Sequence, residues 1–393
     1  MIPRVLQPKL EEWIKYFPVL FLTGPRQSGK TTLVKNTFPD LPYSSLENPD
    51  NREFAENDPR GYLQNFKNGA VLDEVQRVPL LFNYLQGIVD QDPNKRFILS
   101  GSQNFLLHQG ITQSLAGRAG VLSLLPFCVS EIITARGENA IKPWEELLFN
   151  GFYPGIYDRN IPPAVFYPSY ISTYVERDVR LIKNIGDLNT FIRFLKLCAG
   201  RTGQLLNLSS LASDAGIATN TAKDWLSVLE SSYIIFFLRP YHKNFNKRLV
   251  KMPKIYFYDT GLLCSLLELH SPEQVSKHFA MGSLFENLVI LETLKHNLNR
   301  ALKNTLYFWR DSKGREIDLI IPKEEKDQFA IEIKAGRTKQ MDYFSNLKYW
   351  NGLSQTSPDS SIVIYGGDEH WQTQKGTLIP WKEYHQWLIP IEG

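Results

Sequence analysis

The chain has 393 residues, which is too long for one typical domain of about 150 residues and predicts two or three domains. Its residues are 43% apolar and 22% charged, a composition typical of a folded, soluble protein. The formal net charge is only +3, which excludes a strong attraction of the whole chain to nucleic acid. Any such binding would need a local basic patch.

Three cysteines, Cys128, Cys198 and Cys264, lie far apart and form no Cys-x-x-Cys pair. Their spacing argues against a zinc ribbon or a disulfide framework and suits a reducing compartment. The N-terminus lacks the apolar stretch of a signal peptide. The longest apolar runs are far shorter than the ~20 residues of a membrane helix. We therefore expect a cytoplasmic protein with no membrane partner.

The first 130 residues alternate short apolar runs with longer mixed segments. The runs at 19–24, 70–75 and 97–102 are apolar on both faces, as strands are in parallel sheets that helices cover on either side. Helical segments lie between these runs. The pattern predicts an α/β domain over residues 1–130.

A phosphate-binding loop follows the first of these strands. Residues 24–31 read GPRQSGKT, which fits the pattern G-x-x-x-x-G-K-[ST] and lies between a strand and a helical segment, as the pattern requires. Lys30 is expected to reach the β- and γ-phosphates of ATP, and the hydroxyl of Thr31 to bind Mg²⁺. The expected ATP-binding residues are Gly24, Pro25, Arg26, Gln27, Ser28, Gly29, Lys30, Thr31 and Thr32.

Candidate catalytic residues lie at or after the ends of the next strands. Asp73 and Glu74 end the second strand, at the edge where α/β sheets bind ligands. We expect Asp73 to hold Mg²⁺ and Glu74 to polarise a water molecule as general base. Ser102 is expected to sense the γ-phosphate, although such residues also make ordinary turns. Arg118 is a candidate arginine finger, with a plain surface arginine as the alternative.

The middle of the chain is predicted to be mainly helical. Residues 131–200 are expected to form a helical connector, and residues 201–250 a helix-turn-helix followed by a β-hairpin, as in a winged helix. Within it, Ser209 is expected to cap the first helix and Gly216 to make the turn. Strand patterns return in residues 251–393 and predict a further α/β domain.

A stretch without acidic residues runs from Ser231 to Tyr258. Basic and aromatic side chains are interleaved in it, a mixture that suits phosphate contacts and base stacking. The candidate nucleic-acid contacts are Lys243, Lys247, Arg248 and Lys251. Many winged helices bind protein instead, so a protein partner stays open.

The segment 314–336 predicts two strands joined by a charged turn. Side chains alternate along a strand, so Glu332 and Lys334 share one face of the second strand. If the strands pair, Asp318 and Glu332 can converge on one divalent metal ion, with Lys334 beside it and Glu286 as an upstream acidic partner. Two edge strands with apolar inner and charged outer faces would give the same pattern.

Motifs in a fixed order connect these features. They are LTGPRQSGKTTL, LDEVQRVP, FILSGSQNFLL, SLAGRA, YVERDVR, RTGQLLNLSSLA, YFYDTGL, FENLV, FWRDSKGREIDLII and IEIKAG. On these motifs the chain resembles a widespread prokaryotic family of AAA-type ATPases that carry a C-terminal domain of unknown function. The resemblance implies an AAA-like P-loop ATPase core, a winged-helix segment and a restriction-endonuclease-like C-terminal fold of the PD-(D/E)xK type. It carries over the ATP-site roles of Lys30, Thr31, Asp73 and Glu74.

The combined prediction is an ATP-binding protein that hydrolyses ATP with Mg²⁺ and acts as a switch or motor. The expected partner of its nuclease-like C-terminal module is DNA. Two alternatives stay open: a signalling or toxin–antitoxin-type switch that binds another protein through an inactive nuclease-like fold, and an ATP-regulated DNA nuclease. Arginine fingers often come from a neighbouring subunit, so a homo-oligomer is a further expectation.

Overall fold

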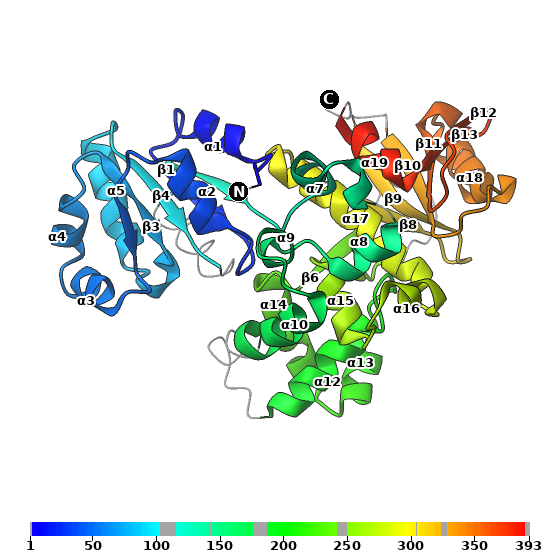
Figure 1. The fold of residues 1–393 in the computed structure, drawn as a ribbon, viewed down its shortest axis with the longest axis horizontal. Coiled ribbons are helices and arrows are strands. Elements are labelled where there is room, and N and C mark those ends of the chain that lie inside the picture. Colours follow the sequence, from blue (N-terminus) through cyan, green and yellow to red (C-terminus); the bar gives the residue numbers. More distant parts are fainter. Residues whose placement is uncertain are drawn as a thin grey trace. The chain divides into compact units, whose positions relative to one another are not determined.

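The computed structural model describes residues 2–102, 115–141, 143–175, 187–241, 250–303, 305–323 and 328–389 (Figure 1). The chain forms two compact units. The first unit comprises Met1–Phe127, Ser231–Tyr233 and Asn297–Leu302. The second unit comprises Cys128–Glu230, Ile234–His296 and Lys303–Gly393. The first unit therefore contains two short segments from far along the chain.

A five-stranded parallel sheet, in the order β2-β3-β4-β1-β5, forms the centre of the first unit. Its strands are β1 (Val19–Thr23), β2 (Tyr43–Ser45), β3 (Gly69–Asp73), β4 (Arg96–Ser100) and β5 (Ala119–Ser123). The three strands expected from the sequence correspond to β1, β3 and β4, and the predicted parallel sheet is confirmed. Every residue of β1 and β3 is buried, as their uninterrupted apolar runs indicate.

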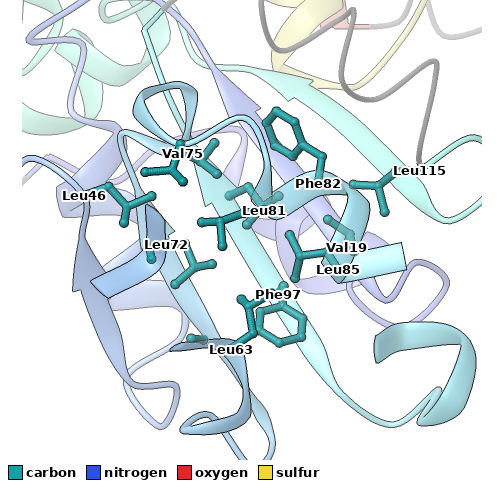
Figure 2. Close-up of a cluster of buried hydrophobic side chains, with 14 of the residues drawn as sticks. Val19, Leu46, Leu63, Leu72, Val75, Leu81, Phe82, Leu85, Phe97 and Leu115 are labelled. Atoms are coloured by element: carbon teal, nitrogen blue, oxygen red, sulfur yellow. The ribbon is translucent and has the colours of Figure 1, made fainter. Parts of the chain in front are cut away.

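Helices cover both faces of this sheet. They are α1 (Gln7–Trp13), α2 (Lys30–Thr37), α3 (Pro49–Asn57), α4 (Pro59–Gln64), the 3-10 helix η1 (Val75–Arg77) and α5 (Leu81–Gln91). Helices α1 and α2 pack in one apolar core with Leu20 and Leu22 of β1. Helices α3, α4 and α5 pack in another core with Val19 and Phe21, as Figure 2 shows in part. Alternate residues of β1 thus face opposite cores.

The second unit begins with a run of helices. They are α7 (Val129–Arg136), η2 (Glu138–Ile141), α8 (Trp144–Asn150), α9 (Pro154–Asp158), α10 (Pro163–Tyr170), η3 (Ile171–Val175), α12 (Leu188–Ala199), α13 (Leu208–Ala215) and α14 (Thr219–Ser231). The first cap expected in this region is wrong, because Asn207, not Ser209, accepts the capping hydrogen bond, from Ser210 N at 3.0 Å. Gly216 does make the turn, with a left-handed φ of 73°.

The second unit also contains an eight-stranded mixed sheet, in the order β12-β13-β11-β10-β9-β8-β6-β7. Its strands are β6 (Ile235–Pro240), β7 (Lys254–Phe257), β8 (Tyr307–Arg310), β9 (Glu316–Pro322), β10 (Gln328–Lys334), β11 (Ser361–Tyr365), β12 (Trp371–Thr373) and β13 (Gly376–Pro380). The hairpin β6–β7 that follows α14 continues this sheet, because Arg239 and Pro240 pair with Tyr307 and Phe308. The predicted boundary between residues 250 and 251 falls between β6 and β7, two strands of this sheet.

The remaining helices pack around this sheet. They are α15 (Thr260–Leu266), α16 (Pro272–Lys277), α17 (Met281–Asn299), η4 (Met341–Phe344), α18 (Ser345–Ser354), η5 (Pro358–Ser360) and α19 (Trp381–Leu388). Trp350 of α18 packs in one core with Trp309 of β8 and Val363 of β11. From α17 onward, the elements run helix, three antiparallel strands, helix and a strand parallel to β10.

Candidate functional sites

The phosphate-binding loop lies between β1 and α2, where the sequence predicts it. Gly24 has a φ of 143°, and a Cβ atom there would lie 2.1 Å from Leu124 O. Gly29 has a φ of 94° and forms the N-cap of α2. Gly24 therefore needs to be glycine because of its positive φ and the close approach of Leu124. Gly29 needs to be glycine because of its positive φ alone. The loop delivers its backbone to the N-terminus of a helix, a place that favours phosphate.

Two buried cations hold this loop. Lys30 Nζ donates to Gly24 O at 2.9 Å and to Pro25 O at 2.7 Å, and Lys30 is only 7% exposed. Arg4 donates to Ser28 O at 2.7 Å and to Leu125 O at 2.6 Å. The role of Arg4 has no motif in the sequence and was missed. The loop is thus braced from both ends before any phosphate contacts it.

The carboxylate of Asp73, at the end of β3, collects four hydrogen bonds. Its Oδ2 accepts from Thr31 Oγ1 at 2.7 Å and from the Tyr43 hydroxyl at 2.9 Å. Its Oδ1 accepts from Ser100 Oγ at 2.5 Å and from Glu74 N at 3.0 Å. Burial and the neighbouring Asp73 carboxylate raise the pKa of Tyr43. The hydroxyl and carboxylate oxygens of Thr31 and Asp73 are the donors that Mg²⁺ prefers, so these residues fit that ion.

Glu74 follows Asp73 in a left-handed conformation, with a φ of 56°. Its Oε2 accepts from Gln76 Nε2 at 2.5 Å. Burial raises the pKa of Glu74, and the charges of Arg26 and Lys30 offset part of the rise. A raised pKa brings a carboxylate closer to the range in which a general base works well. The sequence indicates Glu74 but not its bond to Gln76.

Ser102 lies just beyond the end of β4, the strand between β3 and β1. It is 2% exposed, and within the described part of the chain its hydroxyl makes no hydrogen bond. A buried hydroxyl of this kind calls for an explanation, and a bound group would supply one. Ser102 therefore stays a candidate sensor.

Arg118 does not lie at this site. It directly precedes β5, and its carbonyl accepts from Val19 N at the start of β1. The phosphate loop follows the other end of β1, roughly 15 Å away at ~3.3 Å per strand residue. The Arg118 side chain instead pairs with Asp90 through bonds of 2.5 and 2.9 Å. Arg118 therefore lies beside the start of β1, away from the phosphate loop of its own chain, and a finger role in a neighbouring subunit stays a prediction.

Only one of the four basic candidates for nucleic-acid contact lies among the described residues. Lys243, Lys247 and Arg248 lie outside the described residues. Lys251 is exposed. Lys254, from the same acid-free stretch, is 2% exposed and contacts acidic side chains, so it does not contribute to a basic surface.

The predicted acidic residues of the C-terminal half lie near the place where the pairing of β9 with β10 ends. The last residue pair of these antiparallel strands is Leu319 with Ile331. Asp318 and Glu332 are the next residues along each strand beyond this pair. Asp318 Oδ2 accepts from Ile333 N at 2.8 Å. Lys334 Nζ lies 2.6 Å from Glu332 Oε2 and 3.8 Å from Asp318 Oδ2.

Glu286, from α17, joins Asp318 on its other side, together with Glu316. Carboxylate oxygens of these three residues lie within 4.8 Å of one another. Tyr256 donates to Glu286 Oε1 at 2.5 Å. Burial raises the pKa of Glu286 to about 7, and burial with the charge of Asp318 raises the pKa of Glu332 to about 8.

A metal ion does not fit this acidic cluster as it stands. Three carboxylates could bind one by their chemistry. However, Lys254 Nζ already lies 2.9 Å from Glu286 Oε1 and 2.5 Å from Glu316 Oε1. Glu332, which the sequence places in the metal set, is not among the three close carboxylates. Lys254 and Glu316 are the contributors that the sequence pattern did not assign.

Three stretches of the chain match family models. Residues 16–133 match a model described as an AAA domain. Residues 141–273 and 281–384 match two models, each described as a domain of unknown function. The N-terminal domain is accordingly an AAA-type P-loop ATPase domain.

An uncharacterized protein of Mycobacterium tuberculosis and one of Mycobacterium bovis are each 32% identical to this chain over 327 residues, which cover 82% of this chain and 71% of theirs. An uncharacterized protein of Methanocaldococcus jannaschii is 26% identical, over 53% of this chain and 42% of its own length. Among the described residues, no helix combines the length and apolar character that crossing a membrane requires.

Among solved structures, a Walker-type ATPase of Pyrococcus abyssi is 17% identical, with 66% of this chain and 94% of that chain covered and a TM-score of 0.46. AMPPCP-bound DnaA of Aquifex aeolicus is 16% identical, with 56% and 86% covered and a TM-score of 0.30. At TM-scores below 0.5, neither likeness carries a conclusion.

Proposed function

Because this chain belongs to the same family as the two mycobacterial proteins and carries an AAA-type ATPase domain, we propose that it hydrolyses ATP with Mg²⁺ as a switch or motor. The hydrolysis would act on a C-terminal half that binds nucleic acid. The observation that carries the hydrolysis is the adjacency of Thr31, Asp73 and Glu74 at the phosphate loop. Binding residues and a candidate base lie there in one small region.

Five residues in and around the loop have defined tasks in this proposal. Lys30 would exchange its bonds to Gly24 and Pro25 for bonds to the β- and γ-phosphates. Thr31 and Asp73 would hold Mg²⁺, which neutralises charge that develops on the phosphates. Glu74 would accept the proton of the attacking water. Ser102 would contact the γ-phosphate through its buried hydroxyl.

We assign a restriction-endonuclease-like fold to the C-terminal half. Its support is the order α17, β8, β9, β10, α18 and β11, with Asp318, Glu332 and Lys334 together where the pairing of β9 with β10 ends. We likewise propose the winged helix predicted for residues 201–250, with α13 and α14 as its helix-turn-helix and β6 as the first strand of its hairpin. Its support is that order of elements, with an isolated bridge between Leu205 and Lys254.

DNA is the proposed partner of this half. The support is the acid-free stretch from Ser231 to Tyr258, in which Arg239 and Lys251 are exposed. Replacing Lys247, Arg248 and Lys251 with Glu should weaken DNA binding and reduce its salt dependence. Unchanged binding and salt slope in that variant would rule out the stretch as the DNA contact.

Steady-state ATP hydrolysis with and without DNA tests the proposal. Lys30→Ala should abolish turnover, and Lys15→Ala, at an exposed lysine of the same unit, should not. Stimulation by DNA that disappears in Lys30→Ala would establish a nucleic-acid-coupled ATPase. Turnover that is indifferent to DNA would favour a signalling or toxin–antitoxin-type switch with a protein partner. Equal turnover in wild type and Lys30→Ala would overturn the ATPase itself.

An ATP-regulated DNA nuclease is the second candidate. It is favoured by the closeness of Glu286 to Asp318 and by Lys334, whose Nζ contacts both Glu332 and Asp318. It predicts nicking of plasmid DNA that depends on Mg²⁺ or Mn²⁺ and is lost in Glu332→Ala. Nicking that persists in Glu332→Ala would come from a contaminant.

A further inference from the structure

The acidic cluster of the C-terminal half already contains a cation. Lys254, the first residue of β7, places its ammonium group between Glu286 and Glu316, at 2.9 and 2.5 Å from their Oε1 atoms. Its side chain is 2% exposed, so these carboxylates replace the water that an ammonium group normally binds. Carboxylate oxygens of the third acid, Asp318, lie within 4.8 Å of those of the other two.

The charges of this region are close to balance. Four carboxylates lie here, and three cations contact them. The carboxylates are Glu286, Glu316, Asp318 and Glu332, and the cations are Lys254, Lys334 and Arg310. A divalent ion added to this set would give an excess of positive charge in a largely buried place, and such an excess is costly.

The backbone of Lys254 is fixed on both sides. It pairs with Leu238 of β6 and forms a bridge with Leu205. Lys254 is therefore not a surface side chain that swings into the cluster by chance. Moving its ammonium group away would require a new rotamer in a packed interior or a shift of β7.

We infer that Lys254 is the resident cation of this acidic cluster and excludes divalent metal ions from it. This inference rests on the proposed function only in treating the C-terminal half as nuclease-like. It makes the cluster a closed structural site in which an ammonium group stands where a nuclease would bind metal. An active nuclease would require Lys254 to leave.

A titration of the full chain with Mn²⁺, in the absence of nucleotide, tests the inference. Electron paramagnetic resonance measures the binding, because bound Mn²⁺ no longer contributes to the signal of the free ion. All proteins carry Asp73→Asn, so that the phosphate site contributes no binding. Lys254→Met should bind Mn²⁺ at least about tenfold more tightly than its parent, a difference of ~1.4 kcal/mol. Lys251→Met, at an exposed lysine three residues away, should match the parent. Adding Asp318→Asn to Lys254→Met should remove the gain.

Lys254→Met leaves buried acids without their cation and can fail to fold. Lys254→Met with Glu316→Gln removes one charge of each sign and provides the second variant, which should also gain Mn²⁺ binding. The inference would be overturned if the parent bound Mn²⁺ as tightly as Lys254→Met and lost that binding when Asp318→Asn was added. That result would leave a metal site for the nuclease candidate. If no folded variant bound Mn²⁺, both the inference about Lys254 and the nuclease candidate would be overturned. Neither result bears on ATP hydrolysis, which is measured separately.

Discussion

The hydroxyl of Thr31, at the start of α2, donates a hydrogen bond of 2.7 Å to Asp73 Oδ2 at the end of β3, although 42 residues separate them. The two oxygens that we expect to hold Mg²⁺ are thus adjacent before any nucleotide binds. Positions set in advance reduce the ordering that binding and catalysis would otherwise require. The fold itself, rather than the ligand, brings these groups together.

Asp73→Asn should reduce ATP hydrolysis at least about a hundredfold at saturating Mg²⁺, which corresponds to ~2.7 kcal/mol of lost transition-state stabilisation. The amide keeps the size of the side chain but removes the negative charge that holds the ion. Ser100→Ala is the matched control, because it removes one hydrogen bond to Asp73 Oδ1 and leaves the charge in place. We expect Ser100→Ala to lose far less activity. Full activity in Asp73→Asn across a Mg²⁺ titration would reject the assignment.

Glu74→Gln should bind ATP normally and hydrolyse it very slowly, because the amide cannot accept a proton. In the wild type, the base form is lost as pH falls through the pKa of Glu74. Burial raises that pKa, so the acid limb of the kcat profile should lie above the range of an ordinary carboxyl group.

Gln76→Leu gives a second test of the same residue. The hydrogen bond from Gln76 lowers the pKa of Glu74, so its removal should raise that pKa further and shift the acid limb to higher pH. Above that limb, hydrolysis should approach the wild-type rate. An unmoved limb in Gln76→Leu would show that Glu74 is not the group that titrates.

Arg118→Ala should leave ATP hydrolysis of dilute protein within about twofold of wild type, a difference of ~0.4 kcal/mol. The reason is that Arg118 lies at the end of the sheet where β1 and β5 begin, and the phosphate loop lies at the other end. There Arg118 pairs with Asp90. A role in a neighbouring subunit would appear as activity that rises with protein concentration and is lost in Arg118→Ala. A tenfold loss in dilute protein would contradict the placement.

The features that sequence alone predicts best here are local ones. The loop from Gly24 to Lys30 is one continuous segment with required conformations, and Asp73 ends a strand whose burial its composition shows. Lys254 lies in the stretch without acidic residues, and that local composition alone gives no sign that its side chain pairs with acids. Its partners, Glu286 and Glu316, are supplied by α17 and β9 from later in the chain, and strand order cannot be read from periodicity.

Local patterns also fail to identify an N-cap residue where two nearby residues are both suited to that position. Asn207 and Ser209 are both good N-cap residues, and only the backbone decides between them. Arg118 lies within the motif SLAGRA near the ATPase strands, but the end of the sheet at which it lies depends on the direction of β5. Topology places Arg118 away from the phosphate loop of its own chain, and the role in a neighbouring subunit stays a prediction.

Tyr233→Phe should destabilise the first unit by about 1 kcal/mol, the typical contribution of one hydrogen bond. The buried hydroxyl of Tyr233 lies 2.7 Å from Thr23 Oγ1, which directly precedes the phosphate loop. Tyr16→Phe is the matched control, because Tyr16 is 69% exposed.

Urea unfolding with and without ATP and Mg²⁺ measures this effect. ATP stabilises only the unit that binds it, so the transition that shifts with ATP belongs to the first unit. Tyr233→Phe should lower the midpoint of that transition and leave any other transition in place, although Tyr233 lies between α14 and β6 in the sequence. A loss confined to a transition that ATP does not shift would instead assign residues 231–233 to the second unit.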